Sequence, residues 1–296
     1  MPRLFIGMPV FNGESYVASA IASILDQTYT DFELLIADNA STDATRDICR
    51  RYEDQDSRVH FVENSRNIGG WRNHNKVLAL AQTELFLWAG HDDLRAPESL
   101  QCCIDLLDQD PGAVMAFVGV KRIDENGDDL VFNYFVPDFS DPNPSERFRQ
   151  AIRLDYSLEL FYGVHRTDVI KSTAGLGQFS DSDRVLIAEL ALNGRFAITD
   201  DVMFFRRDHP ERSIKKYGSR QARSEWINPG SGRLSGGFPF HRELWEFSRA
   251  INRSKISLGE KRKCHGHVYD WLKRHHEDLF NDYRRFGRTL IHRMSG

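Results

Sequence analysis

Cysteine and long apolar runs are scarce in this chain of 296 residues. The four cysteines (Cys49, Cys102, Cys103 and Cys264) form no CxxC pair and are too few to staple a chain of this length, which favours a reducing compartment and argues against a structural zinc site. No apolar run approaches the ~20 residues of a transmembrane helix. The N-terminus MPRLFIGMPVFNGE has neither a separate basic segment nor a small-residue cleavage site, so the sequence predicts a cytoplasmic location.

The common phosphate-binding motifs are missing as well. The first apolar segment is followed neither by GxGxxG nor by GxxxxGKS/T, which excludes a dinucleotide fingerprint and a P-loop. With 41% hydrophobic and 28% charged residues, the chain nevertheless has the composition of a globular protein with a sizeable core. We therefore expect one large domain, or one domain with an extension.

Strand and helix patterns alternate through the first 110 residues. Apolar runs LFIGMPV, FELLIAD, RVHFVEN and ELFLWAG are each followed by a polar turn, and the first three turns lead into residues with helical spacing. This alternation predicts an α/β fold with a parallel, doubly wound sheet. Ligands of such sheets lie beyond the carboxyl ends of the strands.

Beyond Asp110 the alternation becomes less regular. GAVMAFVGV predicts a strand, whereas DENGDD and VPDFSDPNPSE are turn and loop material in which an acceptor-binding insertion would fit. DSDRVLIAELALNG predicts an amphipathic helix that ends at Gly194, and RFAITD and VMFFRR predict two further strands. After His209 a polar, Gly-rich stretch precedes two helical segments, HRELWEFSRAIN and one that starts at His267.

Polar side chains gather where the predicted strands end. Taken singly, each has a simple interpretation as a helix cap, a turn residue or a loop acid. Gathered at one edge of a sheet, amides and carboxylates can hydrogen-bond a base and a ribose, and paired acids can hold a divalent cation against a pyrophosphate. The residues are Pro9, Phe11, Asn12 and Glu14; Asp38, Asn39 and the STD at 41–43; Asn67, Gly69 and Gly70; and His91, Asp92 and Asp93.

These motifs resemble the family 2 glycosyltransferases in order and spacing. They are PVFNGESYVASAIASILDQTYTDFELLIADNASTDAT, NIGG with Asn73 and Asn75, and FLWAGHDDL. The resemblance implies a GT-A fold, which is Rossmann-like with a mostly parallel doubly wound sheet, here with a mainly helical C-terminal extension. It also implies inverting transfer of a sugar from a nucleoside-diphosphate sugar to an acceptor hydroxyl, in cell-surface polysaccharide or glycoconjugate biosynthesis. A uridine donor is the first expectation, with thymidine and guanosine donors open.

The resemblance assigns donor binding to particular positions. Asp38 is expected to hold the nucleobase, and the turn at 9–14 is expected to line the same pocket. The full expected donor-binding set is Pro9, Phe11, Asn12, Glu14, Asp38, Asn67, Gly69, Asn73, Asn75, Asp92 and Asp93.

The metal motif of the family is incomplete here. The usual pattern is DxDD, and the resemblance aligns Gly90 with its first acid and Asp92 with the metal-binding second acid. In FFRRDHPERS the resemblance nominates His209 as a further metal ligand, with Arg206 and Arg207 as phosphate partners. A divalent cation, Mn²⁺ or Mg²⁺, is the implied cofactor.

SDSDRVLIAELALNGRF resembles the family's segment in which an acid precedes a helix. The resemblance implies that Asp183 is the general base, with Asp181 beside it. An alternative interpretation is that both are helix N-terminal acids favoured by the helix dipole.

Two other functions remain open. A sugar-phosphate nucleotidyltransferase uses a similar sheet, but it needs a Gly- and Arg-rich loop after the first strand that MPVFNGES does not supply. A non-catalytic nucleotide-sugar-binding protein with the GT-A fold is the second alternative, with Gly90 as a sign of decay at the metal site.

The domain boundary is predicted from a change in composition. We expect a GT-A domain at 1–215, with a donor half at 1–110 and an acceptor half at 111–215, and a basic, mainly helical extension at 216–296. From Arg206 onward there are 21 Lys and Arg against 10 Asp and Glu, a charge of +11, which leaves −15 for residues 1–205. The basic part either meets a separate partner or packs on the acidic part.

The end of the extension has an irregular apolar stripe among cationic side chains. This pattern fits peripheral contact with an anionic membrane at its inner face, a homodimer contact, or packing within the chain, which is slightly favoured. The acceptor is expected to be a saccharide or a lipid-linked molecule, and no nucleic-acid partner is expected. The stripe consists of Val268, Trp271, Leu272, Leu279, Phe280, Tyr283, Phe286 and Leu290.

Overall fold

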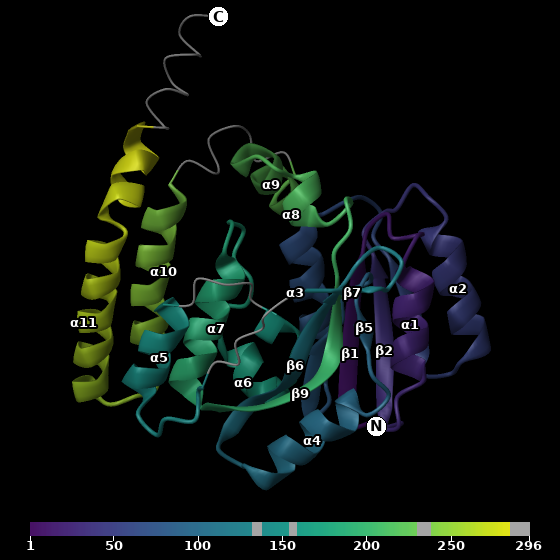
Figure 1. Cartoon of the computed structure of the whole chain (residues 1–296), viewed down its shortest axis with the longest axis horizontal. Helices are drawn as coiled ribbons and strands as arrows, with labels where there is room; N and C mark the ends of the chain where they lie inside the picture. The colour runs from purple at the N-terminus through teal and green to yellow at the C-terminus, as the bar shows by residue number, and fades with distance from the viewer. Residues whose placement is uncertain (132–137, 154–158, 230–237, 285–296) are drawn as a thin grey trace, which may run out of the picture.

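The computed structural model describes residues 1–131, 138–153, 159–229 and 238–284. Within these residues a nine-stranded sheet has the order β3-β2-β1-β4-β8-β6-β9-β5, with β7 paired to β6. Helices α1 and α2 lie toward one end of the molecule, and α10 and α11 lie at the opposite end (Figure 1). Part of the predicted loop VPDFSDPNPSE lies outside the described residues.

The N-terminal half consists of alternating strands and helices, as predicted. Strand β1 lies between β2 and β4, with β3 outside β2, and all these pairs are parallel. Every residue of β1 is buried, as expected where helices cover both faces of a parallel sheet. The elements are β1 (Leu4–Val10), α1 (Val17–Leu25), β2 (Phe32–Asp38), α2 (Thr45–Gln55), β3 (Val59–Glu63), α3 (Gly70–Leu80) and β4 (Leu85–Trp88).

The second half extends the same sheet. Strand β8 is antiparallel to both β4 and β6, and β6 pairs in parallel with β9. The elements are β5 (Leu94–Arg95), α4 (Ser99–Gln109), β6 (Ala113–Ile123), β7 (Asp129–Leu130), α5 (Pro144–Arg153), the 3-10 helix Glu159–Tyr162, β8 (Val164–Arg166), α6 (Thr167–Ser172), α7 (Ser182–Asn193) and β9 (Arg195–Arg207).

Strand β9 corrects one prediction. RFAITD and VMFFRR were expected to form two strands, but they form one continuous strand. The polar residues 199–201 at its centre have no partner in the β6 register, which passes from Phe117 opposite Ile198 to Gly119 opposite Val202. Gly119 leaves room for them, because a Cβ there would lie 2.4 Å from the carbonyl oxygen of Asp200. The β6–β9 register shifts on both sides of Gly119, so a bulge accommodates the polar turn-like segment. Strand β9 therefore runs unbroken from the end of α7 toward His209.

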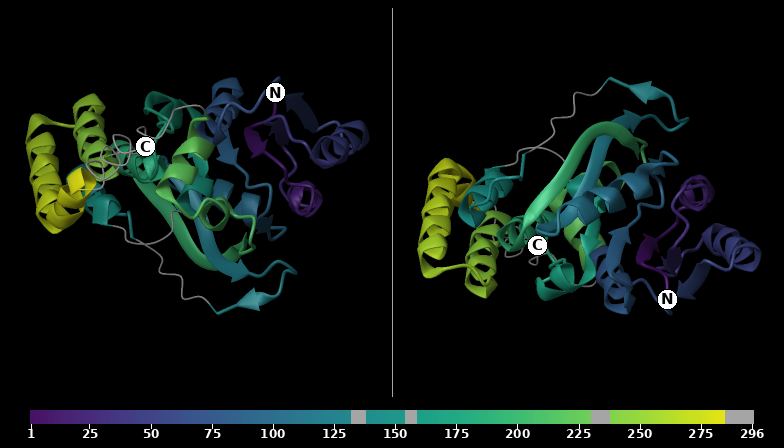
Figure 2. Two further views of the ribbon diagram at one scale, coloured as in Figure 1. Left: turned by 90° about the horizontal axis from the view of Figure 1, so that it is seen from above. Right: turned by 90° about the horizontal axis from the view of Figure 1, so that it is seen from below.

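The C-terminal region is helical, with α8 (Ser213–Lys216), α9 (Arg220–Ile227), α10 (Pro239–Arg253) and α11 (Leu258–Arg274). In two views α10 and α11 lie side by side at the end of the molecule away from α1 and α2 (Figures 1 and 2). Helix α10 packs on α7, and α11 packs on α5 and α10. The domain boundary at 215/216 remains a prediction.

Helix α7 differs from the amphipathic helix that was expected, although it ends at Gly194 as predicted. It is buried on nearly all sides because α5 and α10 both pack on it. The carboxylate of Glu189, 2% exposed, accepts hydrogen bonds from Nε and Nη2 of Arg253 on α10, at 2.9 and 2.8 Å. An ion pair between a buried carboxylate and an exposed arginine thus joins the helical extension to the centre of the molecule.

The apolar stripe of the extension is divided between core and surface. Trp271 is buried edge-to-face against Phe247, with ring centroids 5.6 Å apart, whereas Phe280 and Tyr283 are exposed. Phe286 and Leu290 lie outside the described residues. Across the part of the chain that the structure describes, we find no helix with both the length and the apolar character that a membrane crossing requires.

Candidate active site

The loops after β1 and β2 are joined by hydrogen bonds. Asn12 has a left-handed backbone, with φ of 51°, a conformation in which asparagine is enriched. Its backbone N–H donates to Ser41 Oγ at 2.8 Å, and its side-chain oxygen accepts from the Thr42 N–H at 2.8 Å. Glu14 accepts from the backbone N–H of Ala44 at 2.8 Å. The two loops therefore form one rigid rim at the carboxyl edge of the sheet.

Asp38 ends β2 behind this rim and is fully buried. One carboxylate oxygen, Oδ2, accepts from the Ser41 N–H at 2.9 Å. The other, Oδ1, is buried and has no hydrogen-bond partner among the described residues. A buried acceptor without a donor costs free energy, so this atom is suited to an N–H group supplied by a ligand.

An asparagine network fixes the loop before α3. Asn67 Oδ1 accepts from the Gly69 N–H at 2.8 Å and from Nδ2 of Asn39 at 3.0 Å. Asn73 Nδ2 donates to the carbonyl oxygen of Ala37 at 2.7 Å, so the network joins α3 to β2. The amide of Asn75 instead bonds the backbone of Leu176, donating at 2.8 Å and accepting at 3.0 Å.

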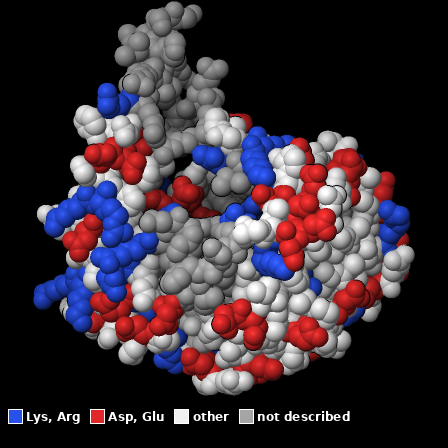
Figure 3. All heavy atoms as spheres, viewed as in Figure 1, with Lys and Arg blue, Asp and Glu red and all other residues white. Residues whose placement is uncertain are grey.

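A cavity of about 630 Å³ opens above these loops. The space-filling view shows a hollow with acidic and basic side chains at its rim, between the helical end and the sheet (Figure 3). The predicted residues that line the cavity are Pro9, Phe11, Asn12, Asn73, Asp92, Asp181, Asp183 and His209. The predicted residues that do not line it are Glu14, Asp38, Asn67, Gly69, Asn75 and Asp93.

Asp92 and His209 meet at the cavity wall, 117 residues apart in the chain. His209 Nε2 lies 3.0 Å from Asp92 Oδ2, and His209 Nδ1 is buried with no partner among the described residues. Burial alone would raise the pKa of Asp92, but the charge of His91 and the contact with His209 hold that pKa well below its usual range. A carboxylate oxygen and an imidazole nitrogen suit Mn²⁺ or, less well, Mg²⁺.

These two groups fit a divalent cation only as a partial ligand set. No cluster of three or more His, Cys, Asp or Glu side chains with metal-binding geometry occurs in the described part of the chain. Oxygen atoms of a bound diphosphate would have to complete the coordination sphere, which is usual for Mg²⁺ bound with substrate phosphates.

Asp93 lies behind Asp92 and anchors β9. Its Oδ1 accepts from the Arg207 N–H at 3.0 Å and lies 3.6 Å from Arg206 Nε. Arg206 lines the cavity and lies over the Tyr162 ring, 5.0 Å from its centroid, whereas Arg207 Nε donates to the carbonyl oxygen of Asp92. Arg206 therefore has its side chain at the cavity, whereas the side chain of Arg207 makes its contacts within the protein.

Neighbouring side chains leave little space for a side chain at position 90. A Cβ atom there would lie 2.7 Å from Asp93 Oδ2 and 3.1 Å from Asp92 Oδ1. The carboxylates of the two following acids thus occupy the space that a side chain at position 90 would need.

Asp181 and Asp183 lie at the start of α7. Asp181 precedes the helix with a left-handed backbone, φ of 65°, and Asp183 is in the first turn. Burial raises the pKa of Asp183 to about 6, and the negative charge of Asp181 acts in the same direction. At neutral pH such a carboxylate is ionised and is a stronger base than an ordinary aspartate.

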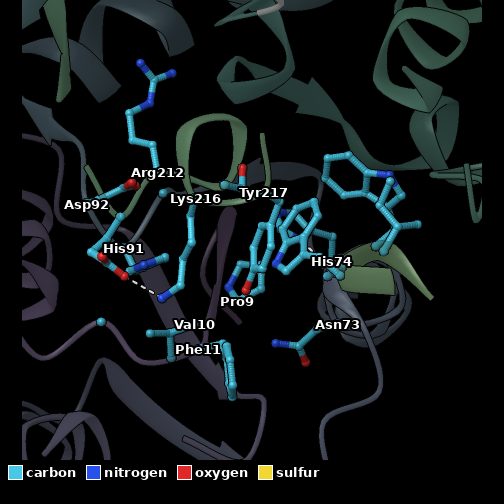
Figure 4. A pocket seen from close by; sticks show the side chains of 18 of the residues that line it. Pro9, Val10, Phe11, Asn73, His74, His91, Asp92, Arg212, Lys216 and Tyr217 are labelled. Atoms are coloured by element: carbon cyan, nitrogen blue, oxygen red, sulfur yellow. Dashed lines mark hydrogen bonds and ion pairs between the residues drawn. The ribbon is translucent and has the colours of Figure 1, made fainter. Parts of the chain in front are cut away.

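The roof of the cavity was not predicted. Lys216 and Tyr217 project into it between the Asp92 side and the Asn73 side (Figure 4). Trp226 of α9 packs on Gly70, where a Cβ would lie 2.7 Å from its ring, and meets Trp71 at 5.3 Å between centroids. A signal was available in the paired glycines 69 and 70, since adjacent glycines permit close approach of another segment.

A comparison with known families identifies the chain. The sequence model described as "Glycosyl transferase family 2" matches residues 5–165, more than half of the length. The chain belongs to this family. The resemblance carried by the strand-end motifs is thereby confirmed.

Curated relatives of this family 2 glycosyltransferase match mainly its N-terminal half. A Bacillus subtilis protein named for teichuronic acid biosynthesis, the glycosyltransferase TuaG, is 30% identical over 129 residues, covering 44% of this chain and 51% of that protein. Chondroitin synthase of Escherichia coli is 27% identical over 140 residues, 47% of this chain and 20% of that protein. The matched segment thus spans about half or less of these relatives.

Solved structures match most of the length of this chain. S. aureus TarS 1–349 in complex with UDP has a TM-score of 0.64 at 17% identity, covering 92% of this chain and 71% of that chain. The mannosyltransferase PcManGT from Pyrobaculum calidifontis, in complex with GDP-Man and Mn²⁺, has a TM-score of 0.55 at 17% identity, covering 90% and 69%. The expected GT-A fold with a helical C-terminal region is confirmed.

Proposed function

We propose that this chain is an inverting glycosyltransferase of the hexosyltransferase type, which moves a sugar from a nucleoside-diphosphate sugar to an acceptor hydroxyl. One observation carries the proposal: a single cavity is lined by the strand-end loops, by the Asp92 and His209 pair, and by Asp183. The family of the chain and the curated relatives named for polysaccharide biosynthesis support a role in making cell-surface polysaccharides or glycoconjugates.

We propose uridine as the base of the donor. The unpartnered Oδ1 of Asp38 is an acceptor that is fully buried beside the cavity; once the loops around it open locally, the edge of uracil, thymine or guanine would offer it an N–H donor. Cytosine has no ring N–H at the corresponding position, so a cytidine donor fits less well. UDP and UDP-GlcNAc complexes of TarS favour uridine, while the GDP-Man complex of PcManGT keeps guanosine open.

The diphosphate is assigned to the wall formed by Asp92, His209 and Arg206. Asp92 and His209 would hold Mn²⁺ or Mg²⁺ together with the donor phosphates, and the cation would neutralise charge on the departing diphosphate. Arg206 belongs to the same wall, and its guanidinium would stabilise the phosphate oxygens of the donor by charge-assisted hydrogen bonds.

Asp183 is assigned the role of base. It accepts the proton of an acceptor hydroxyl while that oxygen bonds to the anomeric carbon and the bond from this carbon to the diphosphate oxygen breaks. The nucleoside diphosphate leaves from the opposite face, and a single displacement inverts the anomeric centre. Asp181 raises the basicity of Asp183 by its charge.

Ligand-induced thermal stabilisation tests the donor site. Uridine, thymidine and guanosine diphosphates and their sugars are added with Mn²⁺, Mg²⁺ or EDTA, because a ligand that binds the folded state raises its melting temperature. One nucleotide should stabilise the wild type, more so with metal. Asp38→Asn should lose the response to the nucleotide, and Asp92→Asn should lose its metal dependence.

The matched control is Asp54→Asn, which changes an exposed acid on α2 far from the cavity and should respond as the wild type does. If no nucleotide or nucleotide sugar stabilises the protein, both the transferase proposal and the nucleotide-sugar-binding alternative are refuted. If a nucleotide sugar stabilises the protein but no nucleoside diphosphate is released from it with any acceptor, the non-catalytic alternative stands. If a free sugar phosphate with a nucleoside triphosphate is converted instead, the nucleotidyltransferase alternative is correct.

We further propose that the protein binds the inner face of an anionic membrane and takes its acceptor there. Lys and Arg side chains gather over α10 and α11 (Figure 3). Exposed aromatic rings lie among them: Arg242 and Arg249 lie over Trp245, and Lys273 Nζ lies 4.2 Å from the ring centroid of Tyr269. Aromatic and cationic side chains on one surface favour binding at the membrane interface.

Co-sedimentation with phosphatidylserine vesicles tests this surface. Binding should weaken with salt and with Tyr269→Ser combined with Lys273→Gln, whereas zwitterionic vesicles should bind little. Point substitutions are preferable to removal of 216–296, because α10 covers buried residues of α7. A dimer in solution that these substitutions dissociate, without vesicle binding, would refute the membrane proposal in favour of a homodimer contact.

A further inference from the structure

One wall of the cavity is built from aromatic rings that come from three separate segments of the chain. Trp226 of α9 stacks on Tyr217, with ring centroids 5.9 Å apart and planes at 26°. Trp71 of α3 meets the Trp226 ring edge-on and lies 6.4 Å from the ring of Phe161, centroid to centroid. Rings of this kind offer a flat apolar surface on which the C–H face of a sugar ring can lie. We call these residues the aromatic wall: Trp71, Phe161, Tyr217 and Trp226.

His74 supplies a polar group beside the aromatic wall. The centroid of its ring lies 5.3 Å from that of Trp71 and 5.7 Å from that of Phe161. Nδ1 of His74 lies 2.9 Å from the carbonyl oxygen of Gly70, and because a carbonyl oxygen can only accept, Nδ1 carries the proton. Burial lowers the pKa of His74 to about 4, so the ring is neutral at neutral pH. Nε2 is therefore an acceptor without a proton.

Nε2 of His74 is open to a ligand. Within the described residues it makes no hydrogen bond, and it is not among the buried side-chain atoms that lack a partner. His74 lines the cavity, so this nitrogen is accessible from it. A bare nitrogen cannot bond to the oxygens of a diphosphate, which are acceptors themselves, but it accepts a hydrogen bond from a hydroxyl. The group that fits it is the hydroxyl of a sugar.

The aromatic wall lies where a single displacement would place the acceptor. Figure 4 shows His74 and Asp92 on opposite sides of the cavity. Under the proposed function the diphosphate lies at Asp92, and the attacking hydroxyl approaches the anomeric carbon from the face opposite the diphosphate. Nε1 of Trp71 donates to the carbonyl oxygen of Phe179 at 3.2 Å, which attaches the wall to the segment that leads to Asp183.

We propose that His74 and the aromatic wall form an acceptor subsite for a sugar residue: the sugar ring lies against the wall, and one of its hydroxyls donates to Nε2 of His74. The inference rests on the proposed function and names the acceptor as a saccharide, free or at the end of a lipid-linked molecule. A prenyl chain has no hydroxyl to donate, so a wall that bound only such a chain would leave Nε2 unused.

The protonation of His74 is tested first, without any ligand. Long-range ¹H–¹⁵N spectra of protein labelled at histidine distinguish a protonated ring nitrogen from a bare one, and His74→Phe assigns the signals. His74 should show a protonated Nδ1 and a bare Nε2 at pH 7. A protonated Nε2 would overturn the proposal, because the ring would then donate to the ligand and not accept from it.

Saccharide binding is measured on protein saturated with Mn²⁺ and the nucleotide found by thermal stabilisation. Methyl glycosides of glucose, galactose, mannose, N-acetylglucosamine and glucuronic acid are added, and at least one should move the Nε2 resonance of His74 and the tryptophan fluorescence. His74→Phe keeps a ring but removes the acceptor, so it should weaken that glycoside about two- to tenfold, the effect of one hydrogen bond. If no glycoside binds and farnesyl phosphate does, the wall takes a lipid chain and the proposal is overturned.

Further variants separate hydrogen bonding from packing. The amide oxygen of His74→Gln can reach the position of Nε2, so this variant should bind the glycoside more tightly than His74→Phe. Trp226→Leu removes part of the wall and should weaken the glycoside about two- to tenfold. His60→Phe, at an exposed histidine on β3, is the control and should bind as the wild type does. Equal weakening in His74→Phe and His74→Gln would show that the ring only packs, contrary to the proposal.

Turnover distinguishes this inference from the proposed function. Release of nucleoside diphosphate from the donor is measured with and without the glycoside. In His74→Phe the KM for the glycoside should rise about two- to tenfold, whereas the Kd of the donor and its release in the absence of the glycoside should not change. If the wild type binds no donor, the proposed function and this inference both fail. If it cleaves the donor but the KM for the glycoside is the same in His74→Phe, only this inference fails.

Discussion

Replacing Asp183 with asparagine should stop sugar transfer and also stabilise the folded protein. Burial and the charge of Asp181 raise the pKa of Asp183 from 3.8 to about 6. A change of one pKa unit corresponds to about 1.36 kcal/mol, so ionised Asp183 opposes folding by at most about 3 kcal/mol. The side chain is partly exposed, and screening by water reduces this to about 1–2 kcal/mol.

The stability difference between Asp183→Asn and the wild type depends on pH, because the raised pKa of Asp183 makes only its ionised form unfavourable in the folded protein. Below pH 3.8 the carboxyl is protonated in both the folded and the unfolded chain, so the wild type loses nothing. Between pH 3.8 and about 6 the unfolded chain releases the proton more readily, and the destabilisation grows; above pH 6 it is constant. Asp183→Asn should therefore gain stability over the wild type only as the pH rises through this interval.

Urea unfolding at pH 8, 5 and 4, followed by tryptophan fluorescence, measures the difference without any substrate. The gain of the variant should be largest at pH 8 and close to zero at pH 4. Asp168→Asn, at an exposed acid on α6, serves as the control and should show no such trend. An equal difference between Asp183→Asn and the wild type at all three pH values would show that Asp183 is not held in an unfavourable charged state.

Three further substitutions test other contacts. Gly90→Asp restores the family's first acid, but its Cβ would lie 2.7 Å from Asp93 Oδ2; it should reduce the melting shift caused by Mn²⁺ with nucleotide, and a larger shift would contradict this packing argument. Gly70→Ala should weaken the docking of α9 by about 1–3 kcal/mol through overpacking against Trp226, seen as faster amide hydrogen exchange at 222–227, while unchanged exchange would show that the ring shifts freely. Arg253→Ala leaves the buried Glu189 carboxylate without its ionic partner; because Arg253 itself is exposed and Glu189 still accepts from the Ala174 N–H, the loss in urea unfolding should be about 1–3 kcal/mol, more than for Arg249→Ala on the same helix.

The fold could be predicted largely because its signals are local. Apolar runs of strand length separated by polar turns mark β1 to β4, and the parallel alternation brings Asn12, Asp38 and Asp92 to one edge. Strand β9 was predicted as two strands because the polar residues at 199–201 favour a turn locally. The glycine at position 119 of β6 removes the steric conflict that would have ended the pairing, and that contact is not visible in the sequence around Asp200.

The candidate site could be predicted only in part. Asp92, His209 and Asp183 were identified by resemblance and line one cavity, but Asp93 and Asn75 serve contacts within the fold. The residues of the roof lie far along the chain from the strand-end loops that they cover. Their positions depend on packing between distant segments, for which the sequence carries no periodic signal.

The cavity has a floor and a roof with different relationships to the family. The floor, made by the strand-end loops and Asp92, comes from the matched region 5–165. The wall residues Asp183, Arg206 and His209 follow that region, and Lys216, Tyr217, Trp226 and Pro239 of the roof come later still. Under the proposed function, mutations in this later part would reshape the space offered to an acceptor without disturbing the buried strands that keep the protein folded. Related proteins could then diversify their products by varying the roof, while the floor kept the same kind of donor.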